Sequence, residues 1–155
     1  MRKFIIVMVA ALAFVACEKN GADYDILVRL TPQSVDIDKD RGGEVVIETD
    51  IDSYIGSIVK INSLDSSASY NVESESFFRT SPPEYLVKFE DIIKYDKYEA
   101  FGCRVIPDGF RRYTIMIEPN CDCNLFEIYF HRIIESESYG KIGGHAPSTL
   151  KIHLK

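Results

Sequence analysis

Hydrophobic and polar residues alternate along most of the chain after its first 25 residues, which is the pattern of half-buried β-strands. The clearest alternation runs through 112–118, 126–131 and 150–155. An earlier alternation covers 26–37, and a β-branched run follows at 44–49. Charged and polar side chains fill the intervening positions. These stretches predict sheets with one face on a shared core and the other in water.

Turn-forming residues separate the predicted strands. The polar run 39–43 contains Gly42 and Gly43, and we expect it to join the strands on either side as a hairpin. Further turns are predicted at 107–109, at 119–120 and across 140–147. Short strands with frequent turns predict an all-β fold, an immunoglobulin-like antiparallel β-sandwich over residues 26–155.

Residues 84–98 fit two patterns. The spacing of Leu86, Phe89 and Ile93 suits one face of a helix, whereas alternate residues from Tyr85 onward suit a strand. We expect a strand followed by a loop.

The start of the chain has a different pattern. Arg2 and Lys3 precede a wholly apolar run at 4–16, which is the layout of a secretory signal. Thirteen residues make roughly 20 Å of helix, against roughly 30 Å for a helix that spans a bilayer. Residues 1–16 are therefore predicted to be an export signal that is removed.

The residues Phe14-Val15-Ala16-Cys17 resemble the lipobox of bacterial lipoproteins, although Leu is commoner than Phe14 and a small residue is commoner than Val15. The resemblance implies cleavage before Cys17 and covalent lipid on its sulfur. Two or three acyl chains would hold the protein permanently on a membrane. The polar residues 17–25 would then be a tether. The alternative is an ordinary signal peptide cut before a buried or paired cysteine.

Four later stretches carry a second resemblance, at 30–37, 42–47, 113–120 and 126–130. They are similar to the BACON-type and related immunoglobulin-like domains of Bacteroidetes surface lipoproteins. The chain departs from that pattern near Tyr54, where a Trp is usual, in the longer middle segment 63–100, and in lacking a terminal Gln. The resemblance implies an outer-membrane lipoprotein, on the cell surface or the periplasmic face, that binds carbohydrate or mucin and is not an enzyme.

The negative net charge argues against polyanionic partners. The whole chain has a net charge of −6, and loss of Arg2 and Lys3 leaves 16 basic against 24 acidic residues, a net charge of −8. Nucleic acid and anionic lipid surfaces demand clustered Lys and Arg, so neither is expected as a partner.

Acidic residues raise the question of a calcium site. Asp36, Asp38 and Asp40 occupy the first, third and fifth places of a calcium-loop pattern. The pattern then fails, because Arg41 stands where Gly is needed and Ile47 where a bidentate acid is needed. A solvated turn is expected instead.

Three cysteines remain once Cys17 is assigned to lipid. In an oxidising envelope they predict one disulfide, Cys103 with Cys121 or Cys123, because a bond between Cys121 and Cys123 would close a very tight ring. A zinc site that adds His145 is the alternative. The ligands lack the paired two-residue spacings typical of zinc sites, so we expect no metal and no cofactor beyond the lipid on Cys17.

Few residues could serve as catalytic bases. His131 and His153 fall on predicted solvent faces of strands, and only His145 lies on a predicted loop. The chain has no Gly-x-Ser-x-Gly nucleophile elbow, and 140–144 lacks the close of a phosphate loop. The sequence therefore predicts a protein that is not an enzyme.

Aromatic residues in the middle segment are the remaining candidates for a binding surface. They are Tyr85, Tyr95, Tyr98 and Phe101. Aromatic faces on loops of a β-sandwich can stack on sugar rings or anchor a protein, although ordinary packing is the alternative. The sequence thus predicts a lipid-anchored binding domain for glycan or glycoprotein, or, as the second hypothesis, an accessory lipoprotein that docks to an envelope protein complex.

Overall fold

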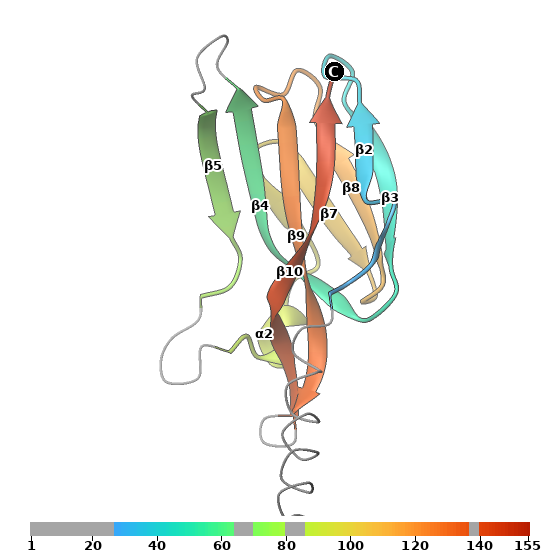
Figure 1. Cartoon of the computed structure of the whole chain (residues 1–155), viewed down its shortest axis with the longest axis vertical. Coiled ribbons are helices and arrows are strands. Elements are labelled where there is room, and N and C mark those ends of the chain that lie inside the picture. Colours follow the sequence, from blue (N-terminus) through green and yellow to red (C-terminus); the bar gives the residue numbers. More distant parts are fainter. Residues whose placement is uncertain (1–26, 64–69, 80–85, 137–139) are drawn as a thin grey trace, which may run out of the picture.

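A computed structural model describes residues 27–63, 70–79, 86–136 and 140–155 (Figure 1). The lipid-attachment candidate Cys17 and the aromatic candidate Tyr85 lie outside these residues. Two five-stranded sheets pack face to face. The all-β sandwich predicted from the alternation is confirmed.

The first sheet contains, in spatial order, β1 (Leu30–Thr31), β3 (Gly43–Thr49), β8 (Arg112–Ile117), β7 (Cys103–Asp108) and β6 (Tyr98–Ala100). The second contains β2 (Ser34–Ile37), β10 (Gly140–Leu154), β9 (Leu125–Ser136), β4 (Ser53–Ser63) and β5 (Tyr70–Ser76). Neighbouring strands are antiparallel except β2 and β10, which are parallel. A short helix, α2 (Phe89–Ile92), lies at one end of the sandwich.

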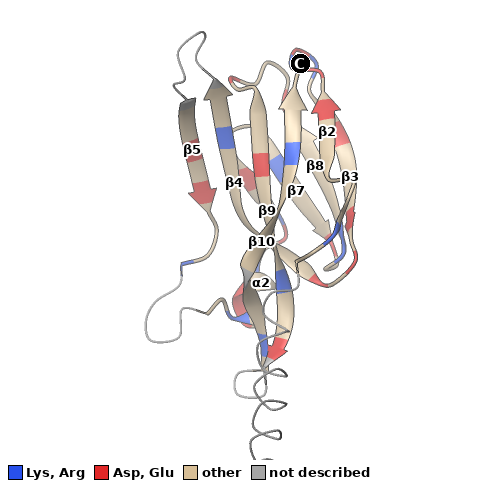
Figure 2. Cartoon of the chain, in the orientation of Figure 1, with Lys and Arg blue, Asp and Glu red and all other residues tan. Residues whose placement is uncertain are grey.

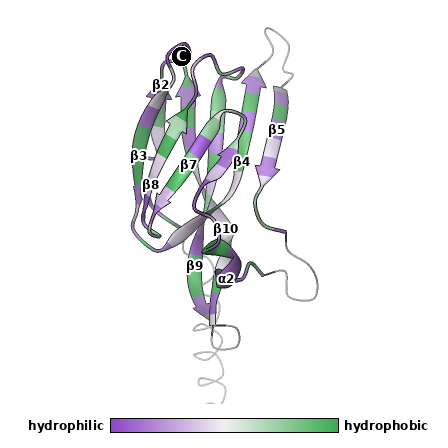
Figure 3. Ribbon diagram, turned by 180° about the vertical axis from the view of Figure 1, so that it is seen from behind, coloured by the Kyte–Doolittle hydropathy of each residue, from purple (hydrophilic) through white to green (hydrophobic). Residues whose placement is uncertain are grey.

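The core is formed by the alternating residues that the sequence marked as apolar. The inward-facing residues from β8, β9 and β10 are Tyr113, Ile115, Ile117, Phe126, Ile128, Phe130, Leu150, Ile152 and Leu154, none more than 7% exposed. Figure 3 shows the same alternation of hydrophobic and hydrophilic residues along the strands. Period-two patterning therefore placed each side chain on the correct face.

Among the described residues, no helix combines the length and the apolar character needed to cross a lipid bilayer.

The hairpin predicted around 39–43 is wrong, although the turn itself is present. The strand before it, β2, pairs with β10 in the second sheet, whereas the strand after it, β3, pairs with β1 and β8 in the first. The turn therefore carries the chain from one sheet to the other. The same turn residues suit a hairpin within one sheet and a turn between two sheets, so the sequence could not distinguish these two connections.

The acidic residues before that turn bind groups of this chain. The Asp38 carboxylate accepts hydrogen bonds from the amides of Asp40 and Arg41, at 2.9 and 3.1 Å. Asp36 forms an ion pair with Lys155 at 2.6 Å, which lowers the pKa of its carboxyl. Within the described ranges no group of three or more candidate ligands could hold a metal ion.

The turn predicted across 140–147 is also wrong, because these residues form the first half of β10. The strand pairs with β9 throughout, with one register shift between Gly143 and Pro147. The glycines permit close packing instead of a turn: a Cβ at Gly143 would collide with the Tyr54 hydroxyl, and one at Gly56 would collide with the His131 ring.

The strand expected within 84–98 is wrong as well. Lys88 forms an isolated bridge to Ile142, and the chain then turns into α2, where Ile92 is 3% exposed. The helical alternative is right only in that one turn of helix forms: Ile93, which the helical spacing placed on the apolar face, is 56% exposed.

A buried hydrogen-bonded network joins the two sheets near α2. The Tyr113 hydroxyl, on β8, donates to the Ser53 carbonyl of β4 at 2.6 Å. The Ser53 hydroxyl lies 2.9 Å from the Tyr113 hydroxyl. The Ser53 hydroxyl is also 3.2 Å from that of Thr49. Because these polar atoms are buried, each depends on the others for the hydrogen bonds that water would otherwise supply.

We predict that Tyr113→Phe lowers the free energy of unfolding by about 1–3 kcal/mol, because it leaves the buried Ser53 carbonyl without its donor. Tyr129→Phe is the matched control: the Tyr129 hydroxyl donates to Glu127 at 2.9 Å on the half-exposed face. Its loss should cost less than about 0.5 kcal/mol. Urea unfolding followed by circular dichroism measures both, and equal effects of the two variants would contradict the structural role of the Tyr113 hydroxyl.

Candidate functional site

Five aromatic side chains gather at the end of the sandwich where α2 lies, and we call this group the aromatic end: Tyr54, Phe77, Phe78, Tyr95 and Tyr98. Tyr95 and Tyr98 stack with ring centroids 5.0 Å apart and an interplanar angle of 2°. Phe78 meets Tyr95 edge to face at 5.0 Å and Tyr54 at 5.3 Å. These residues come from β4, from the segment after β5, from the segment between α2 and β6, and from the start of β6. Residues distant in sequence therefore build one cluster.

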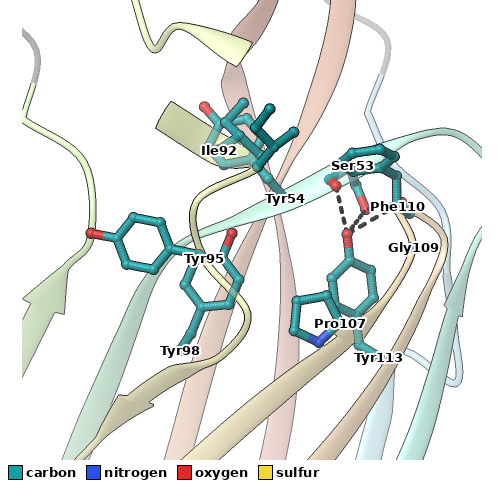
Figure 4. Close-up of a pocket in the computed structure, with 10 residues that line it drawn as sticks. Ser53, Tyr54, Ile92, Tyr95, Tyr98, Pro107, Gly109, Phe110 and Tyr113 are labelled. Carbon is teal, nitrogen blue, oxygen red and sulfur yellow. Dashed lines mark hydrogen bonds between the residues drawn. The ribbon is translucent and has the colours of Figure 1, made fainter. Parts of the chain in front are cut away.

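A first hollow, of about 190 Å³, lies between α2 and the β7–β8 hairpin (Figure 4). Ile92 and Phe110 line it together with Tyr95, Tyr98 and Tyr113. The Tyr113 hydroxyl is already committed to Ser53, as the dashed lines of Figure 4 show. The described residues that line it thus include no charged side chain, and the Tyr113 hydroxyl is fixed by the fold.

A second hollow, of about 260 Å³, lies on the other side of Tyr95. Its lining combines aromatic rings with three charged side chains, Arg79, Asp91 and Lys94. Lys94 pairs with Asp91 at 2.7 Å. The second hollow therefore offers both flat rings and charged groups, whereas the described residues that line the first include no charged side chain.

Tyr95 is the residue that the two hollows share. Its hydroxyl donates to the Phe77 carbonyl at 2.7 Å, and its ring stacks on Tyr98. Both contacts fix the orientation of the ring before any ligand arrives. A wall that is already ordered costs less conformational entropy on binding.

The structure brings together two of the aromatic residues that the sequence proposed and separates a third. Tyr95 and Tyr98 stack, but Tyr98 is only 2% exposed. Tyr98 therefore packs against the ring of Tyr95 and has no exposed ring face of its own. Phe101 lies beyond the far end of β6, where it packs against the core and its carbonyl accepts a hydrogen bond from Cys121. It does not line either hollow.

Sequence reasoning missed Phe77, Phe78 and Phe110. The doublet Phe77–Phe78 directly follows the polar strand β5, and this abrupt change of character was the available signal. Phe110 lies in the turn after Gly109, where the sequence predicted only a turn.

Burial keeps the tyrosine hydroxyls of this region protonated. Burial raises the pKa of Tyr113 to about 12, and it raises the pKa values of Tyr54 and Tyr98 further still. The hydroxyls are therefore hydrogen-bond donors, and they are too weakly acidic to exchange protons near neutral pH.

His131 and His153 lie in strands as the sequence predicted, whereas His145 does not lie on the predicted loop. His131 is half-buried, where its ring stacks on Tyr54 at 5.3 Å and its Nδ1 lies 3.1 Å from the Gly144 carbonyl oxygen. His145 falls within β10 and not on a loop, and its side chain lies outside the described residues. His153, on β10, is also half-buried.

The three described cysteines are free thiols and lie far from the aromatic end. Cys103 faces Ile117 at one end of the β7–β8 pair, whereas the turn that lines the first hollow is at the other end. Cys121 and Cys123 come just after β8, and their thiols neighbour that of Cys103. The predicted disulfide between Cys103 and either Cys121 or Cys123 stays a prediction.

Neither a protein-family model nor a curated protein matches the sequence.

We predict that at pH 11 at least three of the nine tyrosines stay protonated while the chain is folded. An unfolded tyrosine has a pKa near 10. Absorbance at 295 nm should therefore rise, by about three phenolates, when urea unfolds the chain at that pH. Equal absorbance in the two states, with folded circular dichroism retained before urea, would contradict the burial of these hydroxyls.

The same shifts affect stability. Folding raises the pKa of Tyr113 from about 10 to about 12. The protonated Tyr113 hydroxyl therefore contributes fully to the free energy of unfolding below pH 10, and this contribution is lost as the pH rises toward 12.

Proposed function

We propose that this chain is a lipid-anchored envelope lipoprotein whose sandwich binds glycan or glycoprotein at the aromatic end, without catalysis. The observation that carries the proposal is the fixed ring of Tyr95, which forms a wall of two adjoining hollows. The lipobox resemblance at residues 14–17 supports the anchor.

The size and lining of the second hollow suit part of an extended ligand. Its volume, about 260 Å³, is below the roughly 300–1,000 Å³ of sites that enclose a whole small molecule. A single sugar ring of a longer chain matches this size. Aromatic rings would contact the apolar face of the sugar, and charged side chains at the rim would bind its hydroxyls or carboxylate.

Charge favours an acidic sugar at this position. Arg79 and Lys94 against Asp91 give the second hollow a local excess of one positive charge, in a chain whose net charge is −6. Elsewhere acidic and basic side chains are interspersed over the strands (Figure 2). Electrostatic complementarity would thus steer anionic glycans toward the aromatic end.

The described part of the chain begins, at Leu27, near the same end of the sandwich. The Arg29 amide donates to the Asp50 carboxylate at 2.8 Å, and nearby Ser53 donates its amide to the Phe110 carbonyl at 2.8 Å. Leu27 is ten residues after Cys17, and ten extended residues reach at most about 36 Å. A lipid on Cys17 would therefore hold the aromatic end close to the membrane surface.

A second candidate function rests on the outer face of the first sheet. Val46, Ile106 and Met116 are 37–38% exposed there, and they lie around Thr114 on three neighbouring strands. The ion pairs Glu48–Arg112 and Glu99–Arg104 flank this patch. An apolar centre with a charged rim is the anatomy of a protein interface, so this face favours docking to an envelope protein.

We predict that Cys17→Ala abolishes labelling of the protein by radioactive palmitate in growing cells, because it removes the sulfur that would carry the lipid. Cys123→Ala is the matched control and should keep the label. Labelling that persists in Cys17→Ala would contradict the lipid anchor.

We predict that the detergent-solubilised chain is retarded in native gels that contain an acidic mucin glycan, and that Tyr95→Ala weakens this retardation roughly tenfold. Tyr129→Ala removes a half-exposed ring away from the aromatic end and is the control. Thermal unfolding of both variants checks that the sandwich is intact.

Equal retardation of the wild type and Tyr95→Ala would contradict binding at the aromatic end. If no glycan retards the chain, and a protein that co-purifies with it is lost on Ile106→Lys, the docking function would replace the proposal.

A further inference from the structure

The three cysteines of the sandwich form one cluster at the end opposite the aromatic end. Cys103 and Cys123 are fully buried, whereas Cys121 keeps 7% of its surface exposed. Cys121 shares a hydrogen bond with Cys123 and is a close neighbour of Cys103. Cys121 is therefore, of the three thiols, the one nearest to solvent.

Hydrogen bonds join the segment that carries Cys121 to the β6–β7 turn, which precedes Cys103. The Cys121 thiol donates to the Phe101 carbonyl at 3.6 Å, and the Glu118 amide donates to the Gly102 carbonyl at 2.9 Å. A Cβ placed on Gly102 would lie 3.0 Å from the Cys121 sulfur. The β6–β7 turn and the segment after β8 are thus already in contact at the two residues that precede Cys103.

The resting thiols react slowly. Burial raises the pKa of Cys123 to about 11 and that of Cys103 further, and it raises the pKa of Cys121 as well. Since the thiolate is the nucleophile in disulfide exchange, the folded cluster should react only when it opens or when an oxidant reaches Cys121.

We propose that Cys121 and Cys103 form a disulfide when the chain meets an oxidant that itself carries a disulfide, such as a dithiol oxidase of the envelope, and that Cys123 stays a free thiol. This inference is independent of the ligand that the aromatic end binds. It chooses between the two alternatives that the sequence left open, because the sequence made Cys103 the common partner of either Cys121 or Cys123.

The exchange takes two steps. Cys121 loses its proton and its thiolate attacks one sulfur of the oxidant, which forms a mixed disulfide and releases one oxidant thiolate. Cys103 then loses its proton and attacks the Cys121 sulfur, which closes the bond and releases the second oxidant thiolate. Two cysteine thiols are oxidised, the oxidant disulfide is reduced to two thiols, and the two protons pass to the released thiolates.

Cys103 is a better partner for Cys121 than Cys123 is. Only Asp122 separates it from Cys121, so their disulfide would close a strained ring. A bond to Cys103 instead joins two segments that the fold already holds together. It should raise the melting temperature by roughly 5–10 °C, because it constrains the unfolded chain.

The test maps the bond in the full-length chain, purified in detergent and equilibrated with glutathione disulfide. Free thiols are then alkylated, and the chain is digested with trypsin, which cleaves after Arg104 and Arg112, and with a protease that cleaves before Asp122. The second cut separates Cys121 from Cys123. Mass spectrometry should find the Cys103 peptide linked to the Cys121 peptide, with Cys123 alkylated.

Variants add an independent readout. Cys123→Ser should keep the linkage and the rise in melting temperature, whereas Cys103→Ser should lose both. Because replacing buried Cys103 can also unfold the chain, the peptide map of the unsubstituted protein decides. A linkage between Cys121 and Cys123, a linkage between Cys103 and Cys123, or three alkylated thiols after oxidation would each overturn the proposal.

Discussion

The hydrogen bond from the buried Tyr113 hydroxyl to the Ser53 carbonyl connects the two sheets, and the aromatic end depends on it. Ser53 begins β4, directly after the chain crosses from the first sheet to the second. Tyr113 also lines the first hollow. The same residue therefore joins the two sheets and forms part of the surface that a ligand would meet.

The aromatic end differs from the rest of the core in how it is filled. Along most of the sandwich, aliphatic and phenyl side chains from paired strands pack against each other. Near α2, rings from separate segments pack edge to face, and Tyr54 and His131 stack where only glycine fits at Gly56 and Gly143. Rigid packing of this kind leaves Tyr95 ordered, which suits binding. The buried hydroxyls, all protonated near neutral pH, suit hydrogen bonding and not proton transfer.

Sequence periodicity predicted what depends on neighbouring residues and failed where distant contacts decide. The alternation at Phe126, Ile128 and Phe130 predicted their burial, because successive side chains of a strand point to opposite faces. The 39–43 turn was predicted, but not the exchange of sheets across it, because sheet membership is set by distant partners. Glycines at 140–147 predicted a turn, whereas they lie in β10, where Gly143 makes room for Tyr54. Of the candidate site, Tyr95 and Tyr98 were found, while Phe77 and Phe78 became recognisable only through their contacts with them.

Antibody labelling of intact cells, compared with permeabilised cells, tests most directly whether the anchored sandwich is displayed where it can capture glycans. An antibody raised against the sandwich should label intact and permeabilised cells to the same extent. Labelling that appears only after permeabilisation would place the domain in the periplasm and would contradict capture of glycans at the cell surface.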